Sequence, residues 1–306
     1  MDKVASDSLI KPDMPAVLER FHLALNENGF LLPLFEALSN AVDGVDARFD
    51  AFASVKGQIA IRFEHLNDPA RFLLSVTDNG VGLDGDNYKS FRTPYSGYKL
   101  ERRGRGFGRF IAFKVFNRVH YSSRYEENSV EQTRTFRFDI GREEEIVFHD
   151  GTPDFDGRGL RVEMDDARPE WAPLIQSLDR EHIQEEIGAH FMPYFLNRPL
   201  PKITVQFNDE PPIEIAEHFK AMFKESISAP FTCEIDGVEC DLTYTLTRVP
   251  RSARFRSHKV LFAAADRIVG QARDVSAKIG ADSFEGPDGS KYVVIAIVRA
   301  QPSNSG

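Results

Sequence analysis

The segment from residue 31 to residue 47 most constrains the fold, because it predicts a helix that is apolar nearly all round and must therefore be buried. Glu36, Asn40 and Asp43 nevertheless follow each other at i, i+4 and i+7, so they share one face of this helix. A polar stripe on a buried helix must face something polar. Two interpretations are open: a solvated edge, or a site where an amide oxygen holds a hard cation such as Mg²⁺ and a carboxylate polarises a water.

A second constellation follows an apolar strand predicted at residues 71–78. This strand ends at Asp78, and Gly80 and Gly82 come directly after it. A carboxylate at a strand end can accept a hydrogen bond from an exocyclic amine, and glycines let a ligand approach the backbone closely. The same spacing is also common in ordinary turns, so a plain turn is the alternative.

A third constellation is the run from Gly104 to Gly108, which precedes an apolar helix predicted at residues 109–117. Alternating glycines before a helix expose backbone N–H groups, and the helix dipole adds positive potential, so the run is typical of a phosphate cradle. Its spacing is neither that of a Walker A loop nor that of a Rossmann fingerprint. A solvated basic loop is the alternative, because four arginines crowd this stretch: Arg102, Arg103, Arg105 and Arg109.

The remaining elements predict an α+β protein in two parts, a first domain of residues 1–198 and a second of residues 199–306. The stretch from residue 80 to 108 has no clear period, and loops of that length are usually lids or binding segments. Predicted helices are 15–28 (with Gly29 as a stop), 31–47, 109–117, 178–195 and 213–225; predicted strands are 59–66, 71–78, 117–124, 132–140, 145–149, 158–164, 203–207, 259–264 and 291–299, with a hairpin around Asp236.

Length and charge limit the class of protein. The chain has 306 residues, more than the roughly 250 at which single cores stop growing, so two domains are expected. Its 47 acidic and 38 basic residues leave a formal charge of −9, which disfavours a bulk polyanion binder. The sequence contains no apolar run long enough for a bilayer and no signal pattern at its N-terminus, so we expect a cytoplasmic protein without a membrane partner.

The two cysteines, Cys233 and Cys240, lie on either side of a predicted hairpin turn at Asp236–Gly237. This turn would place them opposite each other across two strands, in the hydrogen-bonded register, where the Cβ atoms lie farther apart. We therefore expect two reduced core thiols and no structural disulfide.

Taken together and in this order, the three constellations resemble the motifs of the GHKL ATPases. This superfamily includes the B subunit of DNA gyrase, the heat-shock-90 chaperones, the MutL and microrchidia proteins and the histidine kinases. The resemblance implies a Bergerat-type α/β sandwich, a mixed sheet covered by helices on one face, followed by a smaller transducer-like α+β domain. The continuation expected beyond such a domain is absent, so the chain is either a compact variant or the N-terminal piece of a longer protein.

The resemblance also implies a role for each matching residue. Glu36 would be the general base for the attacking water, Asn40 would ligate Mg²⁺ between the phosphates, and Asp78 would accept the adenine amine. Residues 83–108 would form an ATP lid whose closure excludes water. The remaining nucleotide-binding residues would be Asp43, Gly80, Gly82, Lys99, Gly104, Arg105, Gly106, Phe107 and Gly108.

Within the superfamily, the hydrolytic branch fits better than the histidine kinases, because only 35 residues precede Glu36 and His22 is the sole histidine among them. In that branch a second domain supplies a cation to the γ-phosphate. Relatives often carry a Gly-Thr pair near the adenine, whereas Gly159 is followed here by Leu160, which leaves the adenine contact on this side open. Candidates for the cation that the second domain would supply to the γ-phosphate are Arg251, Arg254, Arg256 and Lys259.

Three hypotheses about function follow. The first is a slow Mg²⁺-dependent ATPase, a switch in which ATP closes the lid and couples to the second domain or to dimerisation. The second is an interaction module that binds ATP without hydrolysing it. The third, the ATPase part of a DNA-acting machine, rests on family analogy alone. The expected partners are ATP and ADP, with an ATP-dependent homodimer, a protein client or a downstream domain as further partners, and contact with DNA is left open.

Overall fold

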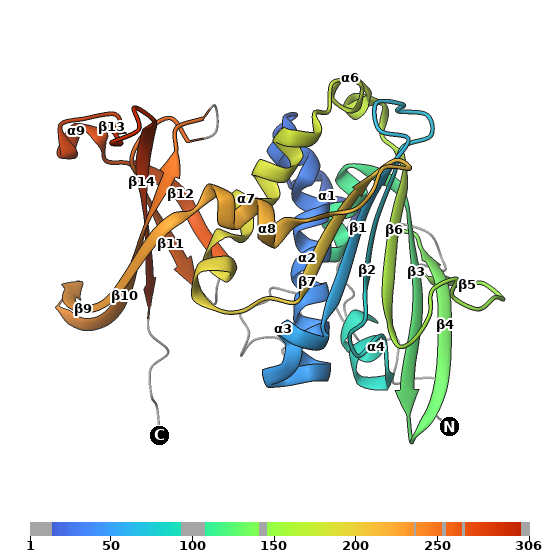
Figure 1. Ribbon diagram of the computed structural model, residues 1–306. Helices are drawn as coiled ribbons and strands as arrows, with labels where there is room; N and C mark the ends of the chain where they lie inside the picture. The colour runs from blue at the N-terminus through green and yellow to red at the C-terminus, as the bar shows by residue number, and fades with distance from the viewer. Residues whose placement is uncertain are drawn as a thin grey trace. The chain divides into compact units, whose positions relative to one another are not determined.

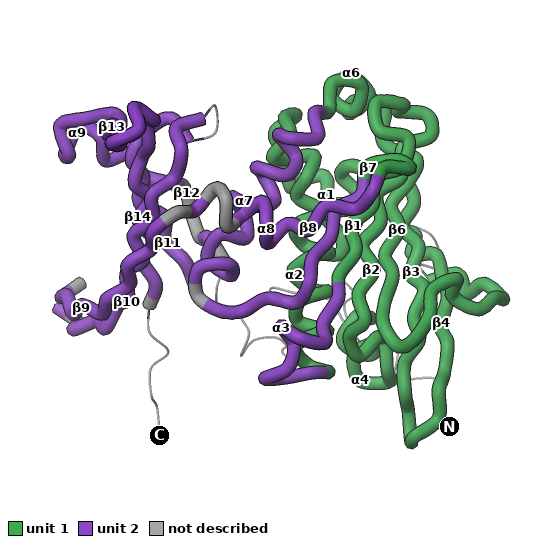
Figure 2. Tube along the Cα trace, in the orientation of Figure 1, with its two compact units in different colours: residues 1–48, 59–178, 207–210 green, residues 49–58, 179–206, 211–306 purple. Residues whose placement is uncertain are grey.

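The computed structural model describes residues 14–92, 108–140, 146–235, 237–252, 255–264 and 267–300 (Figure 1). The chain divides into two compact units, shown in different colours in Figure 2. Unit 1 takes residues 1–48, 59–178 and 207–210, and unit 2 takes residues 49–58, 179–206 and 211–306. A domain boundary at residue 198 stays a prediction.

The larger sheet has eight strands in the order β5-β4-β3-β6-β2-β1-β7-β8. All neighbours from β5 to β1 are antiparallel. The amide of Lys202 donates to the Gly57 carbonyl and the amide of Asn208 to the Phe63 carbonyl, so β7 runs parallel to β1 and the sheet is mixed. The strands are β1 Gln58–Glu64, β2 Leu73–Asp78, β3 Phe116–Glu127, β4 Val130–Phe138, β5 Ile146–Phe148, β6 Gly159–Ala167, β7 Lys202–Phe207 and β8 Ile213–Glu214.

One face of this sheet is apolar and the other is polar. On β1, Ile59, Ile61 and Phe63 are buried, whereas Arg62 between them is exposed. Helix α2 lies beside β1 and β2 in Figure 1 and covers the apolar face. The predicted class, an α/β sandwich with helices on one face, is confirmed. The helices of unit 1 are α1 Met14–Glu19, α2 Glu27–Phe49, α4 Gly85–Arg92, α5 Gly108–Ile111 and α6 Ala172–Gln176, with 3₁₀ turns Ala112–Lys114 and Pro169–Trp171.

An aromatic cluster forms the core of unit 1 beneath α2. The ring of Phe30 lies 5.6 Å from that of Phe72, 6.1 Å from Phe116 and 5.9 Å from Trp171, measured between centroids. The indole N–H of Trp171 donates to the Lys114 carbonyl, so its one polar atom is satisfied inside the core. The apolar side of α2 is therefore anchored by large rings, which leaves its polar stripe pointing elsewhere.

Helix α2 begins earlier than the sequence predicted. The helix expected at residues 15–28 ends at Glu19, and Gly29 lies in the first turn of α2 instead of stopping a helix. The Asn26 side chain accepts the Gly29 amide at 3.0 Å and so caps α2. A Cβ at residue 29 would lie 2.1 Å from the Ala24 carbonyl oxygen, so glycine is needed here for close packing.

Unit 2 is built on a six-stranded sheet in the order β12-β11-β14-β10-β9, with β13 paired to β14. Strand β11 runs parallel to β14, and the other neighbours are antiparallel. Strand β12 was not predicted from the sequence; its segment combines charged residues with a central glycine. The strands are β9 Lys224–Ile235, β10 Val238–Pro250, β11 Lys259–Ala264, β12 Arg267–Asp274, β13 Phe284–Glu285 and β14 Lys291–Ala300.

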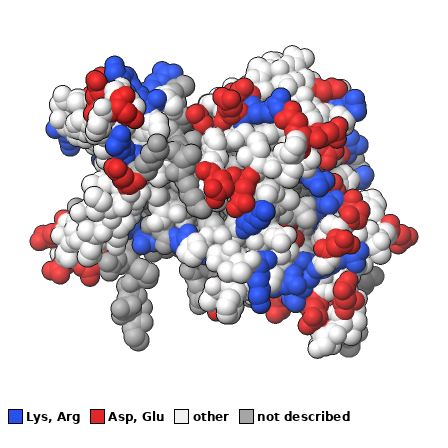
Figure 3. All heavy atoms as spheres, viewed as in Figure 1, with Lys and Arg blue, Asp and Glu red and all other residues white. Residues whose placement is uncertain are grey.

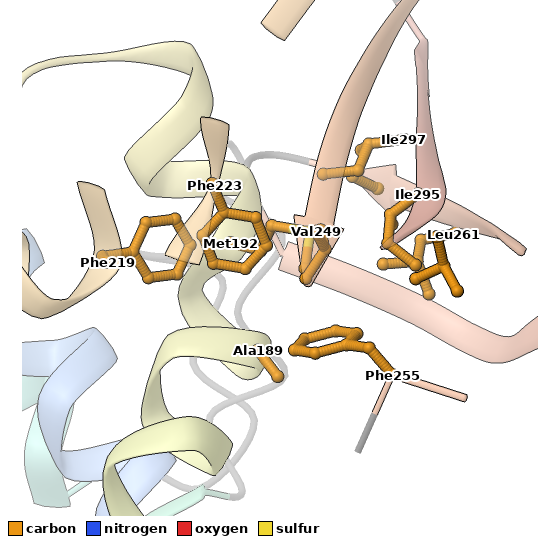
Figure 4. Packing of buried hydrophobic residues seen from close by; sticks show 11 residues of the cluster. Ala189, Met192, Phe219, Phe223, Val249, Phe255, Leu261, Ile295 and Ile297 are labelled. Carbon is orange, nitrogen blue, oxygen red and sulfur yellow. The ribbon is translucent and has the colours of Figure 1, made fainter. Parts of the chain in front are cut away.

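The core of unit 2 lies between two helices and this sheet (Figure 4). Ala189 and Met192 come from α7, Phe219 from α8, and Val293 and Ile295 from the central strand β14. An α+β arrangement for the second part of the chain is thus confirmed. The helices of unit 2 are α3 Ala53–Lys56, α7 Arg180–Asn197, α8 Ile215–Met222 and α9 Ser276–Ile279, with a 3₁₀ turn at Asp50–Phe52.

The hairpin of β9 and β10 has the predicted register. Cys233 pairs directly with Cys240, and Ile235 with Val238 next to the turn. Neither cysteine is in a disulfide, and both are only half-buried, so the prediction that they are core thiols is wrong: they lie at the margin of the sheet. Among the helices of the described residues, none is long and apolar enough to cross a membrane.

Candidate nucleotide-binding site

The polar stripe of α2 lies on the side of the helix that the core does not cover. Glu36 and Asp43 are half-buried and Asn40 is exposed. The opposite side of the helix is inaccessible, with Leu34, Leu38, Val42 and Val45 at 0% exposure. The structure therefore brings the three residues of the first motif together on one open face, as their spacing predicted.

The second motif packs directly against α2. The amide of Val81 donates to the Gly44 carbonyl at 3.1 Å, which ties the turn after β2 to the helix one residue beyond Asp43. A Cβ built on Gly80 would lie 2.4 Å from the carbonyl carbon of Gly44. Glycine at residue 80 therefore lets the turn touch the backbone of the helix, whereas a Cβ on Gly44 would meet only Asp78 Oδ1, at 3.8 Å. Gly44 was not among the residues predicted from the sequence.

Replacing Gly80 with alanine is expected to destabilise unit 1 by about 2 kcal/mol or more, because the new methyl group would overlap the backbone of α2. Urea unfolding followed by the fluorescence of the single tryptophan, Trp171, measures the effect. Gly85→Ala is the matched control: its Cβ would meet only the flexible carboxylate of Glu127, so a small change is expected. Equal stabilities for the two variants would contradict the close contact.

Asp78, the last residue of β2, is 7% exposed. The amide of Gly80 donates to its Oδ1 at 2.7 Å, and the amide of Leu160 also donates to this carboxyl group. Burial raises the pKa of Asp78 to about 7, although these two amides and the nearby Arg48 favour the charged form. Leu160 stands where relatives often carry threonine, and it contacts Asp78 through its backbone amide.

The raised pKa of Asp78 predicts a pH dependence of stability. A carboxyl that holds its proton more tightly when folded stabilises the fold at low pH, and this stabilisation is lost as pH rises from about 4 to about 7. Between pH 5 and pH 8 wild type should therefore lose about 3 kcal/mol relative to Asp78→Asn, which cannot titrate. Urea unfolding of both proteins at the two pH values measures the difference. A constant difference would show that Asp78 ionises normally.

Two further polar residues hold the turn after Asp78, and the sequence analysis missed both. Arg48 donates from Nη1 to the carbonyls of Asn79, at 2.6 Å, and Arg158, at 3.0 Å. Ser123, fully buried on β3, accepts the Leu83 amide at 2.8 Å and donates to the Gly159 carbonyl at 3.2 Å. No local pattern could have pointed to them, because their partners are 31 to 110 residues away in the chain.

Part of the segment predicted as a long loop is helical. Residues 85–92 form α4, and Asp84 caps it by accepting the Asn87 amide at 2.9 Å. Gly108, the last glycine of the third motif, begins α5, but this helix and the 3₁₀ turn after it are shorter than the predicted helix at 109–117. The other predicted residues of this region lie outside the described residues: Lys99, Gly104, Arg105, Gly106 and Phe107.

The candidate cations of the second part of the chain lie in unit 2. Arg251 donates from Nε to the Arg256 carbonyl at 3.1 Å, and Lys259 is the first residue of β11. Arg254 lies outside the described residues. A role for any of them at a γ-phosphate stays a prediction.

Unit 1 thus combines a mixed sheet covered by helices with a strand-end aspartate, Asp78, packed against a helix that carries a polar stripe. Residues 27–144 match the family model of the histidine kinase-, DNA gyrase B-, and HSP90-like ATPases. This region of the chain therefore belongs to the GHKL ATPase superfamily, whose domains bind ATP, typically with Mg²⁺. A comparison with curated proteins gives no match for this chain.

Proposed function

We propose that the protein is a Mg²⁺-dependent ATP-binding and ATP-hydrolysing conformational switch. The observation that carries this proposal is the direct contact between the turn after β2 and α2. The Val81–Gly44 hydrogen bond holds the turn after Asp78 against the helix that carries the polar stripe, which supports a shared site for the two motifs. Because adenine and phosphates are joined through a ribose, a site of this kind needs its base-reading group and its phosphate-side groups on adjacent elements.

Each residue of the site has a proposed role. Asp78 accepts a hydrogen bond from the adenine amine, and Gly80 and Gly82 shape the adenine side. Glu36, half-buried on α2, acts as the general base that takes the proton of the attacking water. Asp43, one turn after Asn40, completes the polar stripe toward the nucleotide.

The donor atoms of the stripe fit Mg²⁺. Asn40 is an exposed residue with an amide oxygen, and its neighbours Glu36 and Asp43 have carboxylates, all of them the hard oxygen ligands that this cation prefers. In the proposed site Asn40 would hold the cation beside the nucleotide phosphates. Bound there, Mg²⁺ neutralises phosphate charge.

We further propose that ATP closes a lid formed by residues 83–108, of which Leu83 and α4 are the anchored part on the sheet, and that closure is coupled to the transducer-like second domain, to dimerisation, or to a protein client. Lid closure excludes water and completes a site, which makes hydrolysis slow and conformationally gated. The family match covers residues 27–144 and so includes this whole segment, which supports its place in the ATP-binding module.

Calorimetry with Mg·ATP, combined with prolonged measurement of phosphate release, tests the proposal. Binding with slow turnover supports a switch that hydrolyses ATP. Binding with a gain in melting temperature but no phosphate release supports the alternative, an interaction module that holds ATP. If Mg·ATP produces no binding heat and no gain in melting temperature, both the switch and the interaction module are contradicted.

Strong binding to DNA is not part of the proposal. Figure 3 shows Lys and Arg side chains interspersed with Asp and Glu over the visible face. The net charge of −9 also works against a phosphate backbone at long range. DNA action therefore rests on family analogy alone.

A further inference from the structure

Three arginines donate hydrogen bonds to the carbonyl groups of every second residue in the turn that follows Asp78. Arg48 donates to the Asn79 carbonyl at 2.6 Å, Arg158 donates from Nε to the Val81 carbonyl at 3.1 Å, and Arg134 donates from Nη1 to the Leu83 carbonyl. These arginines come from α2, from the residues just before β6 and from β4. A turn held from three separate elements is fixed without any nucleotide.

Arg134 differs from the other two because it also contacts α4. Its guanidinium lies 4.0 Å from the ring centroid of Tyr88 on α4 and 4.7 Å from that of Tyr125 on β3. Its Nη2 donates to the Tyr125 hydroxyl at 2.9 Å. Only a planar group with several donors can stack on an aromatic ring and reach a carbonyl and a hydroxyl at the same time.

Helix α4 is itself docked on the sheet by aromatic contacts. Phe91 makes edge-on contacts with Tyr121, at 4.9 Å, and with Phe136, at 5.4 Å, between ring centroids. Tyr88 meets Phe136 edge-on at 5.9 Å. Asp84 follows Leu83 in the chain and caps α4, so a shift of α4 would also move Leu83. Arg134 opposes this shift because it contacts both Leu83 and α4.

We infer that Arg134 is a positioning residue for the nucleotide site: it locks the carbonyl of Leu83 and the ring of Tyr88 into one arrangement, so that the adenine-side turn is preformed. This inference rests on the proposed ATP site. Arg134 touches no reacting atom in it and acts through Leu83 and α4. Losing Arg134 lets the turn adopt other conformations, and binding must then select the competent one.

The test is the affinity of Arg134→Met for ADP and for ATP, measured by calorimetry at a temperature where circular dichroism shows the variant folded. We expect both affinities to fall by about tenfold, because the loss acts on the shared adenine side. Arg134→Lys keeps a donor for the Leu83 carbonyl but loses the planar group that stacks on Tyr88. Its nucleotide affinity should therefore lie between those of wild type and Arg134→Met. The matched control is Arg137→Gln, on the opposite face of the same strand and paired with Asp139, which should bind like wild type.

The outcomes separate this inference from the proposed function. If wild type binds no nucleotide, the proposed function fails and the inference falls with it. If wild type binds and Arg134→Met binds equally well, only the inference is overturned. A loss confined to ATP would make Arg134 a phosphate contact and would also overturn it.

A second pair of variants decides the matter if Arg134→Met does not fold. Tyr88→Leu removes the ring that Arg134 stacks on, while Tyr88→Phe keeps it. We expect weaker binding of ADP and ATP for Tyr88→Leu and wild-type binding for Tyr88→Phe. Equal affinities for the two Tyr88 variants would overturn the link between α4 and the turn.

Discussion

Changing Glu36 to alanine should slow ATP turnover by about 10²- to 10⁴-fold while ATP still binds, because a general base acts in the transition state and contributes little to ground-state binding. Glu36→Gln should behave in the same way, since glutamine keeps the shape but cannot take a proton. Phosphate release under saturating Mg·ATP gives the turnover, and calorimetry on the same preparations gives the affinity.

Glu27→Gln is the matched control for Glu36. Glu27 is a half-buried glutamate on the same helix, nine residues earlier and so roughly on the opposite face. This variant should turn over ATP like wild type. Unchanged turnover in Glu36→Ala would reject the assigned base. Phosphate release that is negligible in wild type would instead favour the non-hydrolysing module.

The second large effect is expected for Asp78→Asn, which should weaken ATP binding by about ten- to a hundredfold. The amides of Gly80 and Leu160 already point at this carboxyl group, so an asparagine would turn its oxygen toward them and present its NH₂ to the adenine amine, donor against donor. Calorimetry with Mg·ATP measures the loss. The same NH₂ group could donate to the carbonyl at the corresponding position of guanine, so the preference for ATP over GTP should shrink.

Asp165→Asn serves as the control for Asp78. It lies on β6, which neighbours β2, on the polar face of the sheet, and pairs with Arg118 at 2.7 Å. Nucleotide affinity should not change in this variant. If Asp78→Asn binds ATP as tightly as wild type does, then Asp78 is a structural aspartate that only holds the turn, and the base is read elsewhere.

Residues close together in the sequence could be placed correctly from the sequence. The spacing of Glu36, Asn40 and Asp43 fixes a common helical face because a helix has a constant period, and α2 shows that face. The end of a strand rich in apolar residues marks Asp78 in the same way. The hairpin pairing of Cys233 with Cys240 follows from a two-residue turn.

Residues that act across large separations could not be found in this way. Arg48, Arg134 and Arg158 resemble ordinary surface arginines in the sequence, yet each reaches a carbonyl of one turn from a distance of 31 to 77 residues. Helix α4 was missed as well, because its short segment is polar and is stabilised mainly by Phe91 and Tyr88 packing on distant strands.

The order and spacing of three motifs determined the superfamily, because helical period and strand ends are properties of neighbouring residues. Only the tertiary structure showed that Gly44 touches the turn at Gly80, that burial raises the pKa of Asp78, and that arginines hold the turn. Contact and burial depend on which distant segments pack together, and packing is a property of the whole folded unit.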